Sequence, residues 1–123
     1  MTADDFRRLA LSFPDAVENS HMGHPDFRVH GRIFATLQYP DESWGMVKLT
    51  PEDQQTFVQA HPEAFVSVKG AWGRQGCTSV RLEAADESTL TEAFGIAWRN
   101  AGAERPKKQP QKGTSIRRPR KSR

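Results

Sequence analysis

The sequence has one cysteine, Cys77, no apolar run of membrane-spanning length, and no acidic residue between Arg105 and Arg123. A single cysteine excludes an internal disulfide and a zinc site built from several thiolates. A helix that crosses a bilayer needs about 20 apolar residues, and the N-terminus lacks the basic and then apolar pattern of a secretory signal. We therefore expect a soluble, cytoplasmic protein that does not contact a membrane.

Basic residues are concentrated in the same acid-free C-terminal segment. Nine of the 18 Lys and Arg residues lie in residues 105–123, so a chain with a formal net charge of +3 carries −6 on residues 1–104. Residues 104–123 have one apolar side chain, Ile116, and three prolines, too little apolar surface to offset the entropy of ordering. We predict that residues 104–123 form a disordered basic tail. Its candidate phosphate contacts are Lys107, Lys108, Lys112, Arg117, Arg118, Arg120 and Lys121.

Residues 1–103 have the size and the patterns of one α+β domain. The spacing of Thr2 and Asp5 predicts a capping box for a helix from Ala3 to Ser12, and Thr50 and Asp86 are N-caps for two later helices. Between the helices, alternating apolar residues predict strands, including one at 78–82, while residues 65–68 are expected to pack under a loop. This order predicts a compact antiparallel β-sheet with helices packed on one face.

The segment 20–27 contains a first candidate site. His21 and His24 lie three residues apart and Asp26 follows, so a curled loop could offer three metal ligands. Gly23 and Pro25 disfavour the helix on which paired zinc histidines usually lie. We expect hydrogen-bonded loop histidines here, and we predict no metal and no cofactor.

The segment Gly70–Gly76 is a second candidate site. Its glycines would let backbone N–H groups converge on an anion, and Lys69 and Arg74 would add positive charge. The Gly-Lys-Ser/Thr ending of a Walker loop is absent. The alternative is a turn or bulge before the last strand, with Trp72 packed as an anchor.

Strand alternation suggests a third site. If Val29, Leu37, Val47 and Leu82 face the helices, the residues between them face away and mix cations with aromatic rings, as in proteins that hold single-stranded nucleic acid. Those residues are Arg28, His30, Lys48 and Arg81, with Phe34 and Trp44. The alternative is a solvated sheet face with scattered cations. No spacing matches a nucleophile elbow or a metalloprotease helix, so we expect a non-enzymatic protein.

Four segments, taken together, resemble a known family. These are His21–Val29, Gly31–Leu37, Val47–Glu52 and Gly70–Thr78, and with a last helix ending in Ala97-Trp98-Arg99 they are similar to the MmcQ/YjbR family of small bacterial proteins. The resemblance covers about residues 6–98. It implies a CyaY-like fold and a DNA-binding role that rests on similarity to double-wing DNA-binding modules. It brings no catalytic residues, and the acidic first helix through which the fold's namesakes bind iron is reduced here to Asp4 and Asp5.

Our leading hypothesis is therefore a monomeric DNA-binding protein of this family. Besides the tail, its candidate contacts are Arg28, Lys48, Lys69, Trp72, Arg74 and Arg81. The alternative hypothesis is a module that binds a small molecule or a protein in a pocket between the His21–His24 loop and the Trp72 loop. That pocket would be lined by His21, His24, Phe27, Trp72 and Thr78.

Overall fold

A computed structural model describes residues 1–38 and 41–103, and the predicted tail at 104–123 lies outside the described residues. The sheet has six strands in the order β1-β2-β3-β4-β6-β5, and every neighbouring pair is antiparallel. The helices are α1 (Ala3–Leu11), α2 (Pro51–Ala60), α3 (Ala71–Arg74) and α4 (Glu87–Ala103). The strands are β1 (Ala16–His21), β2 (His24–Val29), β3 (Arg32–Leu37), β4 (Trp44–Lys48), β5 (Phe65–Ser67) and β6 (Cys77–Arg81).

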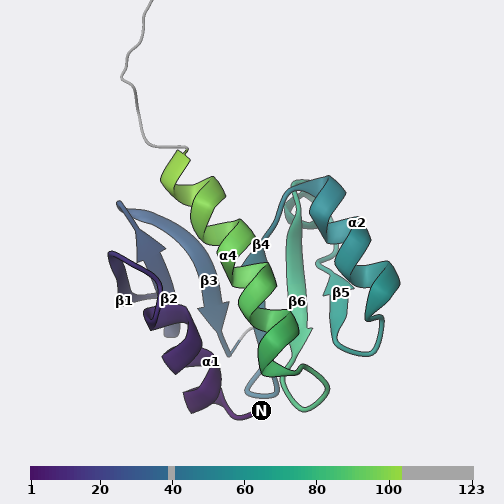
Figure 1. Cartoon of the computed structure of the whole chain (residues 1–123), viewed down its shortest axis with the longest axis horizontal. Coiled ribbons are helices and arrows are strands. Elements are labelled where there is room, and N and C mark those ends of the chain that lie inside the picture. Colours follow the sequence, from purple (N-terminus) through teal and green to yellow (C-terminus); the bar gives the residue numbers. More distant parts are fainter. Residues whose placement is uncertain (39–40, 104–123) are drawn as a thin grey trace, which may run out of the picture.

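The three longer helices cover one face of the sheet, as the sequence predicts. Figure 1 shows α4 running across the middle of the sheet, with α1 on the side of β1 to β3 and α2 on the side of β5 and β6. Phe94 of α4 is fully buried, and its ring packs edge to face against Phe6 of α1 and Phe34 of β3. On the other side, Phe57 of α2 packs on Phe65 of β5. The apolar stripe of α4 is therefore core.

The helix starts follow their capping signals. The Thr2 side chain accepts a hydrogen bond from the Asp5 N–H, and the Asp5 carboxylate accepts one from the Thr2 N–H. At the start of α2 the Thr50 side chain accepts a hydrogen bond from the Asp53 N–H, and the Asp86 carboxylate accepts one from the Thr89 N–H at the start of α4. The predicted helix end at Ser12 is wrong by one residue, because Ser12 is the C-cap.

Two tight turns connect the first three strands, one between β1 and β2 and one between β2 and β3. His30 and Gly31 have φ of 53° and 82°, and Met22 and Gly23 have φ of 51° and 81°, so each pair forms a two-residue hairpin turn with positive φ at both positions. The first turn is the one predicted at His30-Gly31. The second corrects a prediction: His21 and His24 pair across the ends of β1 and β2 and do not belong to an open loop.

Three further predictions are wrong for packing reasons. Residues 65–67 form β5, which pairs with β6, and do not pack under a loop. The glycine-rich segment contains α3, and Trp72 is 63% exposed and not a packed anchor. Phe34 lies at an irregularity in the β2–β3 register and turns its ring to Phe94, so it faces the helices and not the open face.

Candidate nucleic-acid interface

The α3 turn is held by close backbone packing. A Cβ on Gly73 would lie 1.5 Å from the Val68 carbonyl oxygen, and a Cβ on Gly76, at φ 109°, would lie 1.8 Å from the Leu49 carbonyl oxygen. From α2, the buried Gln54 side chain donates hydrogen bonds to the carbonyls of Gly73 (2.9 Å) and Cys77 (2.8 Å). The glycines therefore allow the turn to approach its neighbours, and α3 is fixed to both β6 and α2.

The hydrogen bonds of the α3 turn engage part of the backbone predicted to cradle a phosphate. The N–H groups of Arg74, Gln75 and Gly76 donate to carbonyls within the turn, from Gly70 to Gly73. These three donors are therefore not available to an anion.

The α3 turn presents a large aromatic ring to solvent. Trp72 is among the most exposed large apolar side chains of the described residues, and Lys69 and Arg74 beside it are both exposed. Lys48, also exposed, ends β4 directly opposite Cys77, where β6 begins after α3. We call Lys48, Lys69, Trp72 and Arg74 the α3 edge. The structure thus brings four of the predicted contacts to one end of the sheet.

The end of α4 lies next to the α3 edge. Lys48, Gln75 and Ala101 line one pocket of about 390 Å³, so the last turns of α4 are close to both β4 and the residue that follows α3. Residues 104–123 continue the chain directly from α4, which ends at Ala103. The chain therefore leaves α4 at the same end of the fold as the α3 edge.

Arg81 and Arg28, the other two contacts predicted within residues 1–103, lie elsewhere in the fold. Arg81 is at the opposite end of β6 from Cys77, with its guanidinium 4.5 Å from the centroid of the Trp44 ring. Trp44 and Arg81 alternate with Gly45 and Val80, which face the helices, so this cation–π pair lies on the open face of the sheet. His30, predicted on the open face, sits in a turn beside Gly102 of α4.

Arg28 is engaged in a charge cluster within the sheet. Its Nε and Nη2 donate to the two oxygens of the buried Asp26 carboxylate at 2.8 and 3.1 Å, and His21 Nδ1 lies 2.7 Å from the same group. Burial raises the pKa of Asp26, but the hydrogen bonds and charges of Arg28 and His21 outweigh it, and the pKa lies below its ordinary value. Asp26 is therefore ionised and neutralises much of the charge that Arg28 could offer to a phosphate.

Acidic side chains are scarce on the sheet. Within the described strands only Glu18 and Asp26 are acidic, and Glu18 binds Arg7 of α1 at 3.0 Å, on the helical side. Among residues 1–38 and 41–103, no group of three or more His, Cys, Asp or Glu side chains could hold a metal ion. The negative charge of the body therefore lies mainly on its helices and loops.

The predicted pocket between the His21–His24 segment and the Trp72 segment does not form. Phe27 and Thr78 are both 0% exposed, and the Phe27 ring contacts Phe6 on the helical side. His21 and His24 lie on β1 and β2, whereas Trp72 precedes β6, which is separated from β2 by β3 and β4. These five residues therefore cannot surround one ligand.

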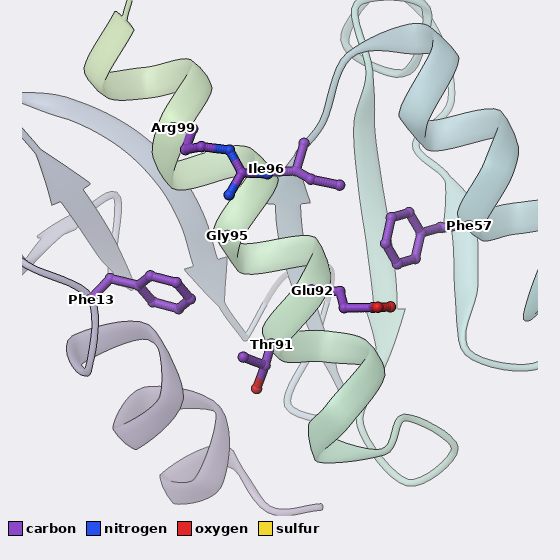
Figure 2. Close-up of a pocket in the computed structure, with 7 residues that line it drawn as sticks. All are labelled: Phe13, Phe57, Thr91, Glu92, Gly95, Ile96 and Arg99. Carbon is purple, nitrogen blue, oxygen red and sulfur yellow. The ribbon is translucent and has the colours of Figure 1, made fainter.

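A second hollow lies on the helical layer. Figure 2 shows Phe13 and Phe57 on opposite sides of α4, with Ile96 and Arg99 between them, around a pocket of about 510 Å³. None of the predicted site residues lines it.

The interpretation of the sequence missed Asn100, which lines the pocket beside Lys48. The sequence nevertheless contains a pattern that could have indicated this residue. Asn100 follows Ala97 by three residues, so it places a polar side chain on the buried stripe of α4, where an apolar one would be expected.

Comparisons with known proteins agree with the fold. The family model described as YjbR matches residues 11–100. The crystal structure of Deinococcus radiodurans protein DR2400, described as a DUF419 domain, superimposes with a TM-score of 0.72 at 19% identity, covering 87% of this chain and 83% of that one. At this identity the likeness concerns the fold alone. No curated protein matches the chain. None of the helices in the described part of the chain has the length and apolar character that crossing a bilayer requires.

Proposed function

The chain belongs to the YjbR family, and we propose that it is a non-enzymatic DNA-binding protein that holds a DNA strand at the α3 edge. The observation that carries the proposal is Trp72, an exposed ring on a rigid turn, at the same end of the sheet as the exposed cations Lys48, Lys69 and Arg74. An aromatic ring flanked by cations is the usual means by which proteins hold bases and phosphates of a single strand.

The rigidity of the turn matters for this role. Because the backbone of the turn is already fixed, only the side-chain torsions of Trp72 must be ordered when a base stacks on its ring, so more of the stacking energy contributes to binding. Base stacking on an aromatic side chain contributes about 1–3 kcal/mol per base. The three cations would contact the phosphates on either side of the stacked base.

The C-terminal segment supports the same site. The nine cations of residues 105–123, with no acid among them, give that segment a field that attracts any nucleic acid, and it follows α4, whose Ala101 lines a pocket with Lys48. We propose that residues 104–123 supply sequence-independent, salt-dependent attraction. The α3 edge then positions the strand.

The experiment is a binding titration of the full chain with a fluorescent single-stranded oligonucleotide at low salt. Replacing Trp72→Ala should weaken binding by about 5- to 150-fold, the loss of one stacked base, without lowering stability, because the ring is exposed. Met22→Ala is the matched control, since Met22 is 92% exposed and lies in the β1–β2 turn. Equal affinity of the Trp72→Ala variant and the unmodified protein would refute the proposed site.

A further inference from the structure

A polar pocket adjoins the α3 edge. It has a volume of about 390 Å³, within the range of small-molecule sites, and lies among the end of β4, the start of α2, Gln75 and the last turns of α4. Ile33 and Leu49 from the sheet side and Ala97 and Ala101 from α4 give it apolar walls. Its polar groups come from Lys48, Thr50, Gln75 and Asn100.

Asn100 has an unused hydrogen-bond donor. Its Nδ2 is buried and has no hydrogen-bond partner among the described residues. A buried amide without a partner is destabilising, and such groups are rare in folded proteins. An acceptor atom of a ligand in the pocket would satisfy it.

The charged residues that line the pocket indicate which charge the ligand should carry. Lys48 is the one charged residue that lines it, and no Asp or Glu does. The Thr50 hydroxyl is already engaged with Asp53 at the start of α2, to whose carboxylate it donates at 2.9 Å. The groups that remain for a ligand are thus the Lys48 ammonium and the side-chain amides of Gln75 and Asn100, and the positive charge of Lys48 favours an anionic oxygen.

We propose that this pocket binds a phosphate monoester with a planar or apolar body. Lys48 and Asn100 hold the phosphate oxygens, since ammonium and amide N–H groups are both good donors to phosphate. The apolar walls receive the body. Two sources share this chemistry, a free nucleotide and the phosphorylated end of a DNA strand. The inference does not depend on DNA binding at Trp72.

The first test compares adenosine 5′-monophosphate with adenosine by thermal shift and calorimetry on the full chain. The monophosphate should bind saturably and raise the unfolding temperature, and adenosine should bind at least tenfold more weakly, because it lacks the phosphate. Equal binding of both compounds, or no saturable binding of the monophosphate, overturns the inference.

A second test uses Asn100, which lies outside the α3 edge. Asn100→Leu should raise the unfolding temperature of the free protein, because it removes an unpaired buried amide, and should abolish the shift caused by the monophosphate. Asn100→Asp should also abolish that shift, through repulsion. Asn19→Leu, at an exposed position of β1, is the control and should keep it. A Leu or Asp variant at position 100 that binds the monophosphate as well as the unmodified protein contradicts the assignment.

A third arm separates the two sources. In the Trp72→Ala background, a 5′-phosphorylated oligonucleotide that binds more tightly than its unphosphorylated form identifies a strand end. If phosphorylation makes no difference while the free monophosphate binds, the ligand is a free nucleotide. If the protein binds the monophosphate but does not bind DNA in the titration, the proposed function is wrong and the assignment of this pocket still holds.

Discussion

At the scale of the residue, Asp26 shows how an acidic side chain can be buried in a sheet. The carboxylate is 0% exposed and accepts two hydrogen bonds from Arg28, with His21 within hydrogen-bonding distance. From the sequence, Asp26 was predicted only as a third possible metal ligand. That Arg28 neutralises the Asp26 carboxylate could not be predicted, because this contact depends on two residues of β2 projecting from the same face and on the pairing of β2 with β1.

We predict that Asp26→Asn destabilises the protein by about 2 kcal/mol or more at neutral pH, because Arg28 loses a charged partner. The pKa of Asp26 is lowered in the folded state, so its stabilisation is complete above the unfolded value of about 4 and is lost as pH falls through the lower folded value. Urea unfolding at neutral and at acidic pH measures this. The variant should lose less stability on acidification than the unmodified protein.

Glu42→Gln, at an exposed loop position, is the control and should leave the acid sensitivity unchanged. An Asp26→Asn variant with the same stability and the same pH dependence as the unmodified protein would show that the Arg28 contact contributes nothing.

At the scale of the element, local signals predicted the helices well and the short strands poorly. Thr2, Thr50 and Asp86 cap the helices that they were expected to cap, because a cap is formed within four residues of sequence. The three residues of β5 carry no periodicity of their own and become a strand only through pairing with β6. The ring of Phe34 escaped prediction because a register irregularity changes which face a residue occupies.

The glycines of the α3 turn give an element-level prediction. Gly73→Ala places a Cβ against the Val68 carbonyl, so the turn must move, and we expect a loss of about 3 kcal/mol or more. Gly95→Ala in α4 is the matched comparison: the added Cβ would come no nearer than 3.6 Å to another side chain, and the variant should be as stable as the unmodified protein or more stable by up to about 1 kcal/mol. Chemical denaturation of both variants checks this. Equal losses would mean that close packing does not fix α3.

At the scale of the whole molecule, charge is segregated twice. The C-terminal segment carries nine cations while residues 1–104 carry a net −6, and within the described body the strands hold few acids. The separation of charge between the C-terminal segment and residues 1–104 could be predicted from the sequence. The gathering of Lys48, Lys69, Trp72 and Arg74 at one end of the sheet could not be predicted, because it depends on the pairing of β4 with β6 and on the hydrogen bond from the Leu49 N–H to the Gly76 carbonyl.

Removal of residues 104–123 should therefore change the salt dependence of DNA binding. If most of the nine cations contact phosphates, affinity of the full chain should fall on the order of 10³-fold or more between about 50 and about 200 mM salt. The truncated protein should bind more weakly at low salt and with a much shallower slope. If the affinity for DNA falls equally steeply with salt in the full chain and the truncated protein, residues 104–123 make no phosphate contacts.

The three tryptophans allow the central claim to be measured directly, because they lie in three different places. Trp72 is exposed at the α3 edge, Trp44 lies under Arg81 on the open face, and the Trp98 indole donates to the Pro14 carbonyl within the helical layer. The measurement is an NMR titration of the three indole N–H signals of the full chain with single-stranded DNA. DNA bound at the α3 edge shifts the Trp72 signal and leaves that of Trp98 unchanged. A shift of Trp44 without one of Trp72, or no shift at all, would contradict binding at the α3 edge.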